Sequence, residues 1–173
     1  IQINNDIEND NSNTNKFLIK MINLKDDDKL LSQREKDRIT GKYIYLELSS
    51  NDIRNLLTDL TNKLISKGYT TSTVNFDKNN DLTTGILNLE IVAGRIEDIR
   101  INSGNRLDKY KEFFMFSRNK GKILNIRDID TATDNFNSIN ANNMTMEVLP
   151  GRKTNYSRIE VKNTLKNKYT VGI

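Results

Sequence analysis

Acidic residues supply the patterns in this sequence that come nearest to a metal-binding or catalytic centre. Asp77, Asn79 and Asp81 have the alternate spacing with which a calcium-binding loop begins. The sixth and twelfth positions of that loop are occupied by Leu82 and Asn88, where calcium loops have Gly and Glu. We therefore interpret this segment as a solvated hairpin turn.

A second acidic cluster is Asp26-Asp27-Asp28. Three adjacent carboxylates do not converge on one ion, so we interpret the cluster as favouring the start of the helix that follows it. The chain has no Cys and no His, which excludes disulfides, a thiol nucleophile, an imidazole base and a zinc site of the usual kind. We therefore expect no enzyme activity, no metal and no cofactor.

The charged residues are distributed as on an ordinary solvated surface. The 27 basic and 23 acidic residues give a net charge of +4, and both signs are interspersed along most of the chain. Tyr110, Phe113, Phe114 and Phe116 have helical spacing for part of their length, and we expect them to be buried in a core instead of stacking on bases. We predict no nucleic-acid partner and no small-molecule substrate.

Composition predicts two small domains instead of one large core. Hydrophobic residues make up 35% of the chain, and no run approaches the length of a membrane-spanning helix. The segment 1–16 is polar and is expected to be a flexible leader. We place the first domain at 17–93, the second at 94–163 and the start of a further link at 164–173.

Periodicity predicts the elements of the first domain. Apolar residues at 17–24 indicate a strand, and the charged segment 29–38 indicates a short helix. A longer helix is expected to follow the N-cap Ser49, with Asp52 completing a capping box and Gly68 ending the helix in the left-handed conformation. The alternating segments 69–76 and 85–92 then predict a hairpin.

The same order recurs about 76 residues later, which indicates an internal repeat. The offset aligns Leu48, Asp52, Ile53 and Leu60 with Leu124, Asp128, Ile129 and Phe136. We expect Leu60 and Phe136 to be buried in equivalent positions. A strand containing Met144, Met146 and Val148, a turn centred on Pro150 and Gly151, and a strand over 156–161 would complete the second copy.

Several of these segments resemble the POTRA domains of two-partner secretion transporters. The runs 64–71 and 81–97 resemble the first such domain, and 121–130 with Leu149-Pro150-Gly151 resemble the second. The resemblance implies an α+β fold of two tandem POTRA-like β-α-α-β-β domains, each a small mixed three-stranded sheet covered by two helices. One departure is Asn155, near which the family usually has a Gly.

The resemblance also implies a function. These proteins export haemolysin-like or adhesin-like partners across the bacterial outer membrane, so we expect a protein-transport module at the periplasmic face of that membrane. Its partners would be the secreted exoprotein and the chain's own C-terminal β-barrel in the full-length protein. The alternative is a POTRA module of another machine, such as outer-membrane protein assembly or cell division.

The candidate binding site is a strand edge. Thr70, Thr71, Ser72, Thr73, Val74, Asn75 and Phe76 form an uncharged run, whereas exposed sheet edges normally carry Lys, Pro or a bulge. If this strand lies at the margin of its sheet, as the resemblance implies, its free amides and carbonyls would add a strand from an unfolded client by β-augmentation. The alternative is that neighbouring residues pair with it or cover it. We interpret Gly94-Arg95-Ile96-Glu97 as a structural joint between the domains.

Overall fold

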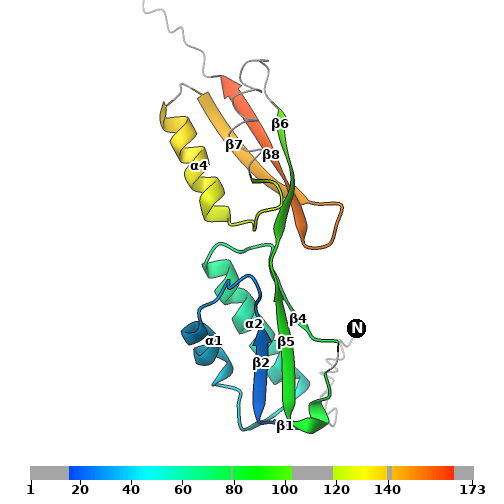
Figure 1. Ribbon diagram of the computed structural model, residues 1–173. Helices are drawn as coiled ribbons and strands as arrows, with labels where there is room; N and C mark the ends of the chain where they lie inside the picture. The colour runs from blue at the N-terminus through cyan, green and yellow to red at the C-terminus, as the bar shows by residue number, and fades with distance from the viewer. Residues whose placement is uncertain (1–15, 79, 103–118, 140–141, 166–173) are drawn as a thin grey trace, which may run out of the picture.

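The computed structural model describes residues 16–78, 80–102, 119–139 and 142–165. They form two αβ units, one above the other, and the last strand of the lower unit leads directly into the first strand of the upper unit (Figure 1). Each unit has its own cluster of buried apolar side chains. The leader up to residue 15, the aromatic cluster at 110–116 and the side chain of Phe136 lie outside what is described.

The first domain contains two helices and five strands among its described residues. They are β1 (Phe17–Ile19), β2 (Met21–Lys25), α1 (Gln33–Thr40), β3 (Leu46–Leu48), α2 (Ser50–Ser66), β4 (Thr73–Phe76) and β5 (Ile86–Val92), with a 3-10 helix at Leu82–Thr84 before β5. The sheet order is β2-β5-β4, in which β5 pairs in parallel with β2 and antiparallel with β4. The predicted mixed three-stranded sheet is therefore confirmed.

The single strand predicted over 17–24 is divided in the structure. β1 pairs with β3, an unpredicted strand, whereas β2 pairs with β5. The chain changes partner at Lys20, whose N–H donates to the carbonyl of Gly85 at 2.7 Å. Continuous hydrophobicity could not indicate this change, because both short strands bury apolar residues.

Both helices begin at a capping box. Ser49 and Asp52 form the predicted box of α2, and Gly68 has the expected left-handed backbone, with φ of 95°. α1 begins later than predicted because Ser32 and Glu35 form a second capping box. Asp26 does not cap this helix; its carboxylate accepts the backbone N–H groups of residues 30 and 31.

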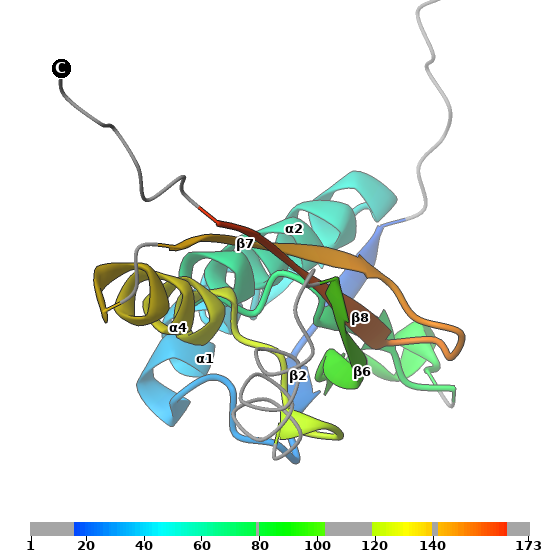
Figure 2. The ribbon, with the colours of Figure 1, turned by 90° about the horizontal axis from the view of Figure 1, so that it is seen from above.

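The second domain repeats the sheet arrangement. Its described elements are β6 (Arg95–Asn102), α4 (Ile126–Ile139), β7 (Asn142–Pro150) and β8 (Tyr156–Leu165). The order is β6-β8-β7, with β8 parallel to β6 and antiparallel to β7. Both views place α4 on one side and the β7–β8 turn on the opposite side (Figures 1 and 2). The second helix expected in this domain falls in 103–118, outside the described residues.

The turn between β7 and β8 differs from the prediction. Pro150 is the last residue of β7 instead of a turn centre, and it pairs with Ser157. The turn is formed by 151–155 and contains Asn155 at φ of 61°. Asn is among the few residues other than Gly that tolerate this left-handed conformation, which explains how this turn forms without the Gly that the resemblance led us to expect near this position.

The two cores hold the layers together. In the first, Leu56, Leu60 and Leu64 of α2 are fully buried with Leu87 of β5, and in the second Leu124 is fully buried. Each such side chain contributes roughly 1.5–3 kcal/mol relative to an exposed position. Within the described part of the chain, no helix combines the length and the apolar character that crossing a membrane requires.

Candidate functional site

The predicted edge strand lies at the margin of the first sheet. β4 has β5 on one side and no strand on the other among the described residues. Of the seven residues predicted to form the site, Thr73, Val74, Asn75 and Phe76 make up this strand. The remaining three, residues 70–72, precede the strand and lie in the connection from α2.

The pairing register decides which residues of β4 face the open edge. In an antiparallel pair, residues that exchange backbone hydrogen bonds alternate with residues whose N–H and C=O groups point away from the partner. The N–H of Asp77 donates to the carbonyl of Asn88 at 3.0 Å, so the odd-numbered residues of β4 bond to β5. The backbone groups of Val74 and Phe76 therefore point outward, and they have no hydrogen-bond partner within the described ranges.

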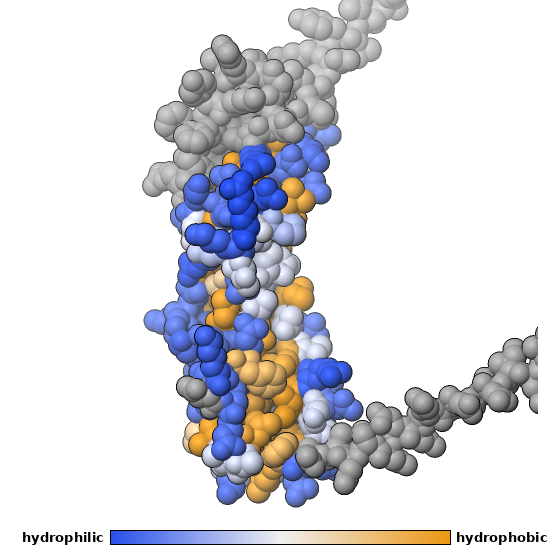
Figure 3. Space-filling view, turned by 90° about the vertical axis from the view of Figure 1, so that its right-hand side faces the viewer, coloured by the Kyte–Doolittle hydropathy of each residue, from blue (hydrophilic) through white to orange (hydrophobic). Residues whose placement is uncertain are grey.

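The side chains of these two residues lie on the helix side of the sheet. Val74 is opposite Ile91 and Phe76 is opposite Leu89, both of which are buried in the first core. Val74 also packs against this core, whereas Phe76 remains 48% exposed at the margin. Figure 3, which views the molecule from the side to the right of Figure 1, shows apolar surface gathered on the lower domain. An added strand would therefore meet both free backbone groups and apolar side chains.

Thr70, Thr71 and Ser72 do not form part of the strand edge. Ser72 is buried, and its hydroxyl accepts the N–H of Gly94 at 3.0 Å. A Cβ atom at position 94 would lie 2.6 Å from the carbonyl oxygen of Thr71, so this close approach requires Gly. The uncharged run predicted as one site is thus divided between a joint and an edge.

That joint connects the end of α2 to the second domain. Asn125 donates its side-chain amide to the carbonyl of Lys67 at 3.2 Å, and the N–H of Ile126 donates to the carbonyl of Gly68 at 2.9 Å. Arg127 donates to the carbonyl of Ser66. The second domain therefore satisfies carbonyl groups that the end of α2 leaves without partners inside the helix.

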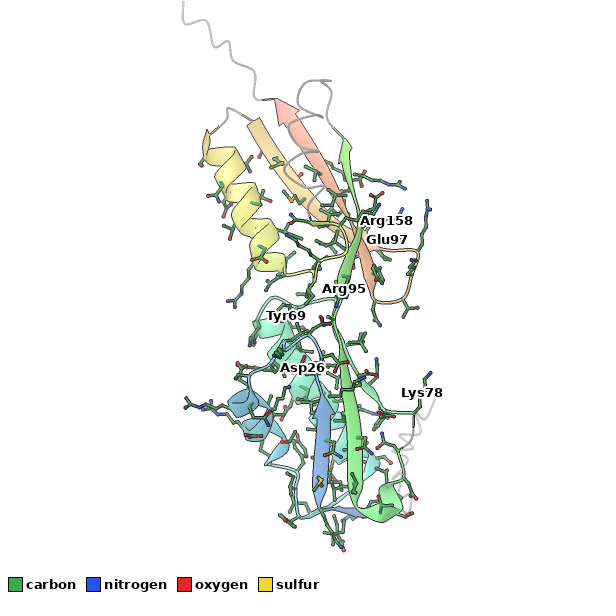
Figure 4. All side chains as sticks on the ribbon, in the orientation of Figure 1. Asp26, Tyr69, Lys78, Arg95, Glu97 and Arg158 are labelled. Atoms are coloured by element: carbon green, nitrogen blue, oxygen red, sulfur yellow. The ribbon has the colours of Figure 1, made fainter. Side chains whose placement is uncertain are left out.

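An ion pair strengthens the same joint. Arg95 and Asp28 approach to 2.6 Å between the guanidinium and the carboxylate, and Figure 4 places Arg95 between the two domains. The N–H of Leu124 also donates to the carbonyl of Gly94 at 2.8 Å, and Ile123 packs on the first core. These contacts confirm that the Gly94–Glu97 segment is a structural joint. Sequence reasoning missed the partners of this joint at 123–127, because no local pattern indicates an inter-domain contact.

The corresponding edge of the second domain is β7, and a side chain covers one part of it. The N–H of Gly151 donates to the carbonyl of Tyr156 at 2.8 Å, so the even-numbered residues of β7 face outward. The outward N–H of Met144 donates to the side-chain oxygen of Asn137 at 2.7 Å, and the Asn137 amide donates back to the carbonyl of Met144 at 2.9 Å. Asn137 thus occupies the position that an added strand would take.

The other end of β7 is closed as well. Pro150 faces outward without an N–H group, and its carbonyl accepts the Arg158 guanidinium at 3.1 Å. Between Met144 and Pro150, two residues of β7 keep open outward groups among the described residues, namely Met146 and Val148, and the charged Glu147 stands between them. Side-chain contacts or the lack of an N–H group therefore protect the β7 edge near both of its ends.

Two polar residues of the calcium-like segment 77–81 accept hydrogen bonds from the protein backbone. Asp81 accepts the N–H of Thr83 at 3.0 Å and caps the 3-10 helix. Asn80 accepts the N–H of Asn88 at 2.6 Å, whereas Asn79 lies outside the described residues. Within the described ranges, no group of three acidic side chains is arranged to hold a metal ion.

Charged groups also fix the helices of the first domain. Burial opposes ionisation of Asp26, but the N–H groups of Leu31 and Leu30 and the Lys36 ammonium outweigh it and lower the pKa of this carboxyl. The N–H of Ser32 and then the ammonium groups of Lys67 and Lys63 hold the pKa of Glu35 well below its usual range. Because Lys63 and Lys67 lie at the end of α2, Glu35 ties α1 to α2.

Comparison with known proteins agrees with this architecture. Residues 17–94 match the family description "POTRA domain, ShlB-type", and residues 95–150 match "POTRA domain". The outer membrane transporter CdiB of Dickeya dadantii is 33% identical over 144 residues, which are 83% of this chain and 25% of the relative. The hemolysin transporter protein ShlB of Serratia marcescens is 33% identical over 116 residues, covering 67% of this chain and 20% of the relative.

Solved structures show the same fold. CdiB from Escherichia coli superimposes with a TM-score of 0.75 at 21% identity, covering 96% of this chain and 30% of that chain. Domains POTRA1-3 of the periplasmic part of Omp85 from Anabaena give a TM-score of 0.68 at 16% identity, covering 89% and 67%. The chain spans about a quarter of the length of the curated relatives that it matches.

Proposed function

Because the chain belongs to the POTRA domain family, with a first domain of ShlB type, we propose that it receives polypeptides for an outer-membrane two-partner secretion transporter. In this proposal the two domains lie at the periplasmic face of the bacterial outer membrane. They bind a secreted exoprotein, haemolysin-like or adhesin-like, in extended form and deliver it to the C-terminal β-barrel of the full-length protein. The module acts by binding and not by catalysis.

The open edge of β4 carries the proposal. Val74 and Phe76 present backbone donors and acceptors that have no partner among the described residues, and no charge stands between them. An extended segment that hydrogen-bonds to these groups adds a fourth strand to the sheet. The half-exposed Phe76 side chain offers it an apolar contact. Main-chain recognition of this kind accepts many sequences, which suits a module that receives an unfolded client.

The transporter relatives favour secretion over outer-membrane protein assembly or cell division. The first domain matches the ShlB-type description, and the curated relatives named above are an outer membrane transporter and a hemolysin transporter. The likeness to Omp85 at 16% identity concerns the fold alone. No described feature favours the assembly or division reading over secretion.

Hydrogen exchange tests the site directly. The chain would be mixed with an uncharged, extended peptide of about twelve residues in which Val and Thr alternate. We expect the amides of Val74 and Phe76 to exchange more slowly when the peptide is bound, because the added strand occupies them. The amides of Met146 and Val148 serve as the internal control and should not change. Protection of β7 alone would move the site to the second domain and contradict the proposal.

A further inference from the structure

A basic hollow lies on the face of the second sheet, beside the β7–β8 turn. Its volume is about 370 Å³, and β6, β8 and the turn contribute its lining. Five cationic side chains line it, against two carboxylates. They are Arg100, Lys120, Arg152, Lys153 and Arg158, with Glu97 and Asp98. Figure 4 labels Arg158 and Glu97 on the side of the upper domain that also bears the turn.

Most of this positive charge is not neutralised within the described structure. Asp98 approaches Lys120 at 3.7 Å and the Arg100 guanidinium at 3.9 Å. No described carboxylate lies within 4.0 Å of the cationic groups of Arg152, Lys153 or Arg158. Two of these side chains contact uncharged groups instead: Arg158 donates to the carbonyl of Pro150, and the Lys153 ammonium lies 5.8 Å from the Tyr156 ring centre.

Glu97, the second carboxylate of the hollow, makes no ion pair within 4.0 Å among the described residues. Its carboxylate accepts the backbone N–H of Arg152 at 2.7 Å, so it fixes the turn and makes no ion pair with the neighbouring side chains. Arg152 and Lys153 are exposed at the rim. Counted with both carboxylates, the five cations still leave the lining with an excess of three positive charges, which is the electrostatic complement of an acidic ligand.

The hollow adjoins one end of the β4 edge. Thr73, the first residue of β4, donates its hydroxyl to the side-chain oxygen of Asn155 at 3.4 Å. Asn155 belongs to the β7–β8 turn and precedes Tyr156, which lines the hollow. Figure 3 shows hydrophilic surface on the upper domain, then paler, mixed surface, and then the apolar surface of the lower domain. A strand paired with Val74 and Phe76 that continues past Thr73 therefore meets the basic hollow.

We propose that the β4 edge and this hollow form one continuous track, whose preferred ligand is an extended peptide with acidic residues just beyond the segment that pairs with β4. This inference rests on the proposed function, because it takes β4 as the pairing edge. Main-chain pairing then supplies tolerance of sequence, and the cations of the hollow supply a preference for Asp and Glu at one flank.

The test compares three fluorescently labelled peptides on the full chain. All share the uncharged Val-Thr segment; one carries about three Asp and Glu residues at its C-terminal end, one carries them at its N-terminal end, and one carries Gln instead. We expect one of the two acidic peptides to bind about tenfold more tightly than the Gln peptide, because several exposed ion pairs act together. The peptide that binds more tightly, with its acidic residues at the C-terminal or the N-terminal end, shows whether the bound strand is parallel or antiparallel to β4.

Matched variants assign that preference to the hollow. Arg152→Gln combined with Lys153→Gln should reduce the acidic peptide to the affinity of the Gln peptide. Arg34→Gln with Arg38→Gln is the control, because it removes the same charge from exposed positions on α1. The preference should also shrink as salt is raised from about 0.05 to 0.5 M, since exposed charges are screened.

The outcomes separate the two proposals. Equal affinity of all three peptides, each weakened by Val74→Pro, would overturn the acidic preference and leave the β4 edge in place. An acidic preference that survives Val74→Pro would show an independent anion site and overturn the continuous track. Failure of every peptide to bind would remove both proposals. Binding of phosphatidylglycerol vesicles that depends on Arg152 and Lys153, without any peptide preference, would assign the hollow to lipid and contradict our inference.

Discussion

The two domains share one sheet order but protect their edge strands differently. In β7 of the second domain, Asn137 covers Met144 near one end, and Pro150 at the other end has no N–H group to offer. β4 of the first domain has neither device, and no charged residue lies between its outward-facing Val74 and Phe76. Since a repeated fold supplies the same edge twice, the difference lies in side chains that the fold does not require. We infer that the first edge is kept open for a client, whereas the second is protected near both of its ends.

The largest expected effect tests the register on which this comparison depends. Asn75→Pro removes an N–H that bonds to β5, whereas Val74→Pro removes an outward N–H that bonds to nothing in the described chain. We expect Asn75→Pro to lower the free energy of unfolding by about 3 kcal/mol, and Val74→Pro to lower it by less than about 1 kcal/mol. Urea denaturation followed by circular dichroism measures both. The reverse order would mean that the other residues of β4 face outward.

Removing the cover from β7 should sharpen the contrast. Asn137→Ala leaves the backbone N–H and C=O of Met144 without their side-chain partner. We expect a loss of roughly 1–2 kcal/mol in the free energy of unfolding, together with new peptide binding or self-association at β7. Analytical ultracentrifugation and peptide titration would detect these. A stable variant with an unchanged binding profile would show that Asn137 does not protect the edge.

Acid should weaken the first domain through its helices. The folded-state pKa values of Asp26 and Glu35 are lowered, so these carboxylates contribute stability that is present above their unfolded pKa near 4 and is lost as the pH falls below it. We expect the melting temperature to decrease from pH 6 to about pH 3. Glu35→Gln should show a smaller decrease than the parent chain. An equal decrease in both would mean that the link between α1 and α2 contributes little.

Local patterns in the sequence predicted much of this fold. The N-cap of α2, its glycine stop and the alternation of β5 depend on residues close in the chain, and all three occur in the structure. The division at Lys20 and the pairing of β1 with β3 depend on distant partners, which no local period specifies.

The candidate site was predicted in part for a similar reason. The lack of charge identified Thr70–Phe76 as unusual, but it did not distinguish the buried Ser72 from the exposed edge. The outward direction of Val74, and the cover that Asn137 provides on β7, follow from hydrogen-bond register in three dimensions. The neighbours of a strand and its hydrogen-bond register must therefore be known before its edge can be assigned as a binding site.

A pair of matched proline variants tests the central claim most directly. Val74 and Val148 are both partly buried valines whose backbone groups face outward, one on each edge strand. Titration of the uncharged Val-Thr peptide into each folded variant would measure the loss of affinity. We predict that Val74→Pro weakens binding by roughly tenfold or more, and that Val148→Pro changes it by less than about twofold. Equal losses in the two variants, or a loss confined to Val148→Pro, would contradict the assignment of the client to the β4 edge.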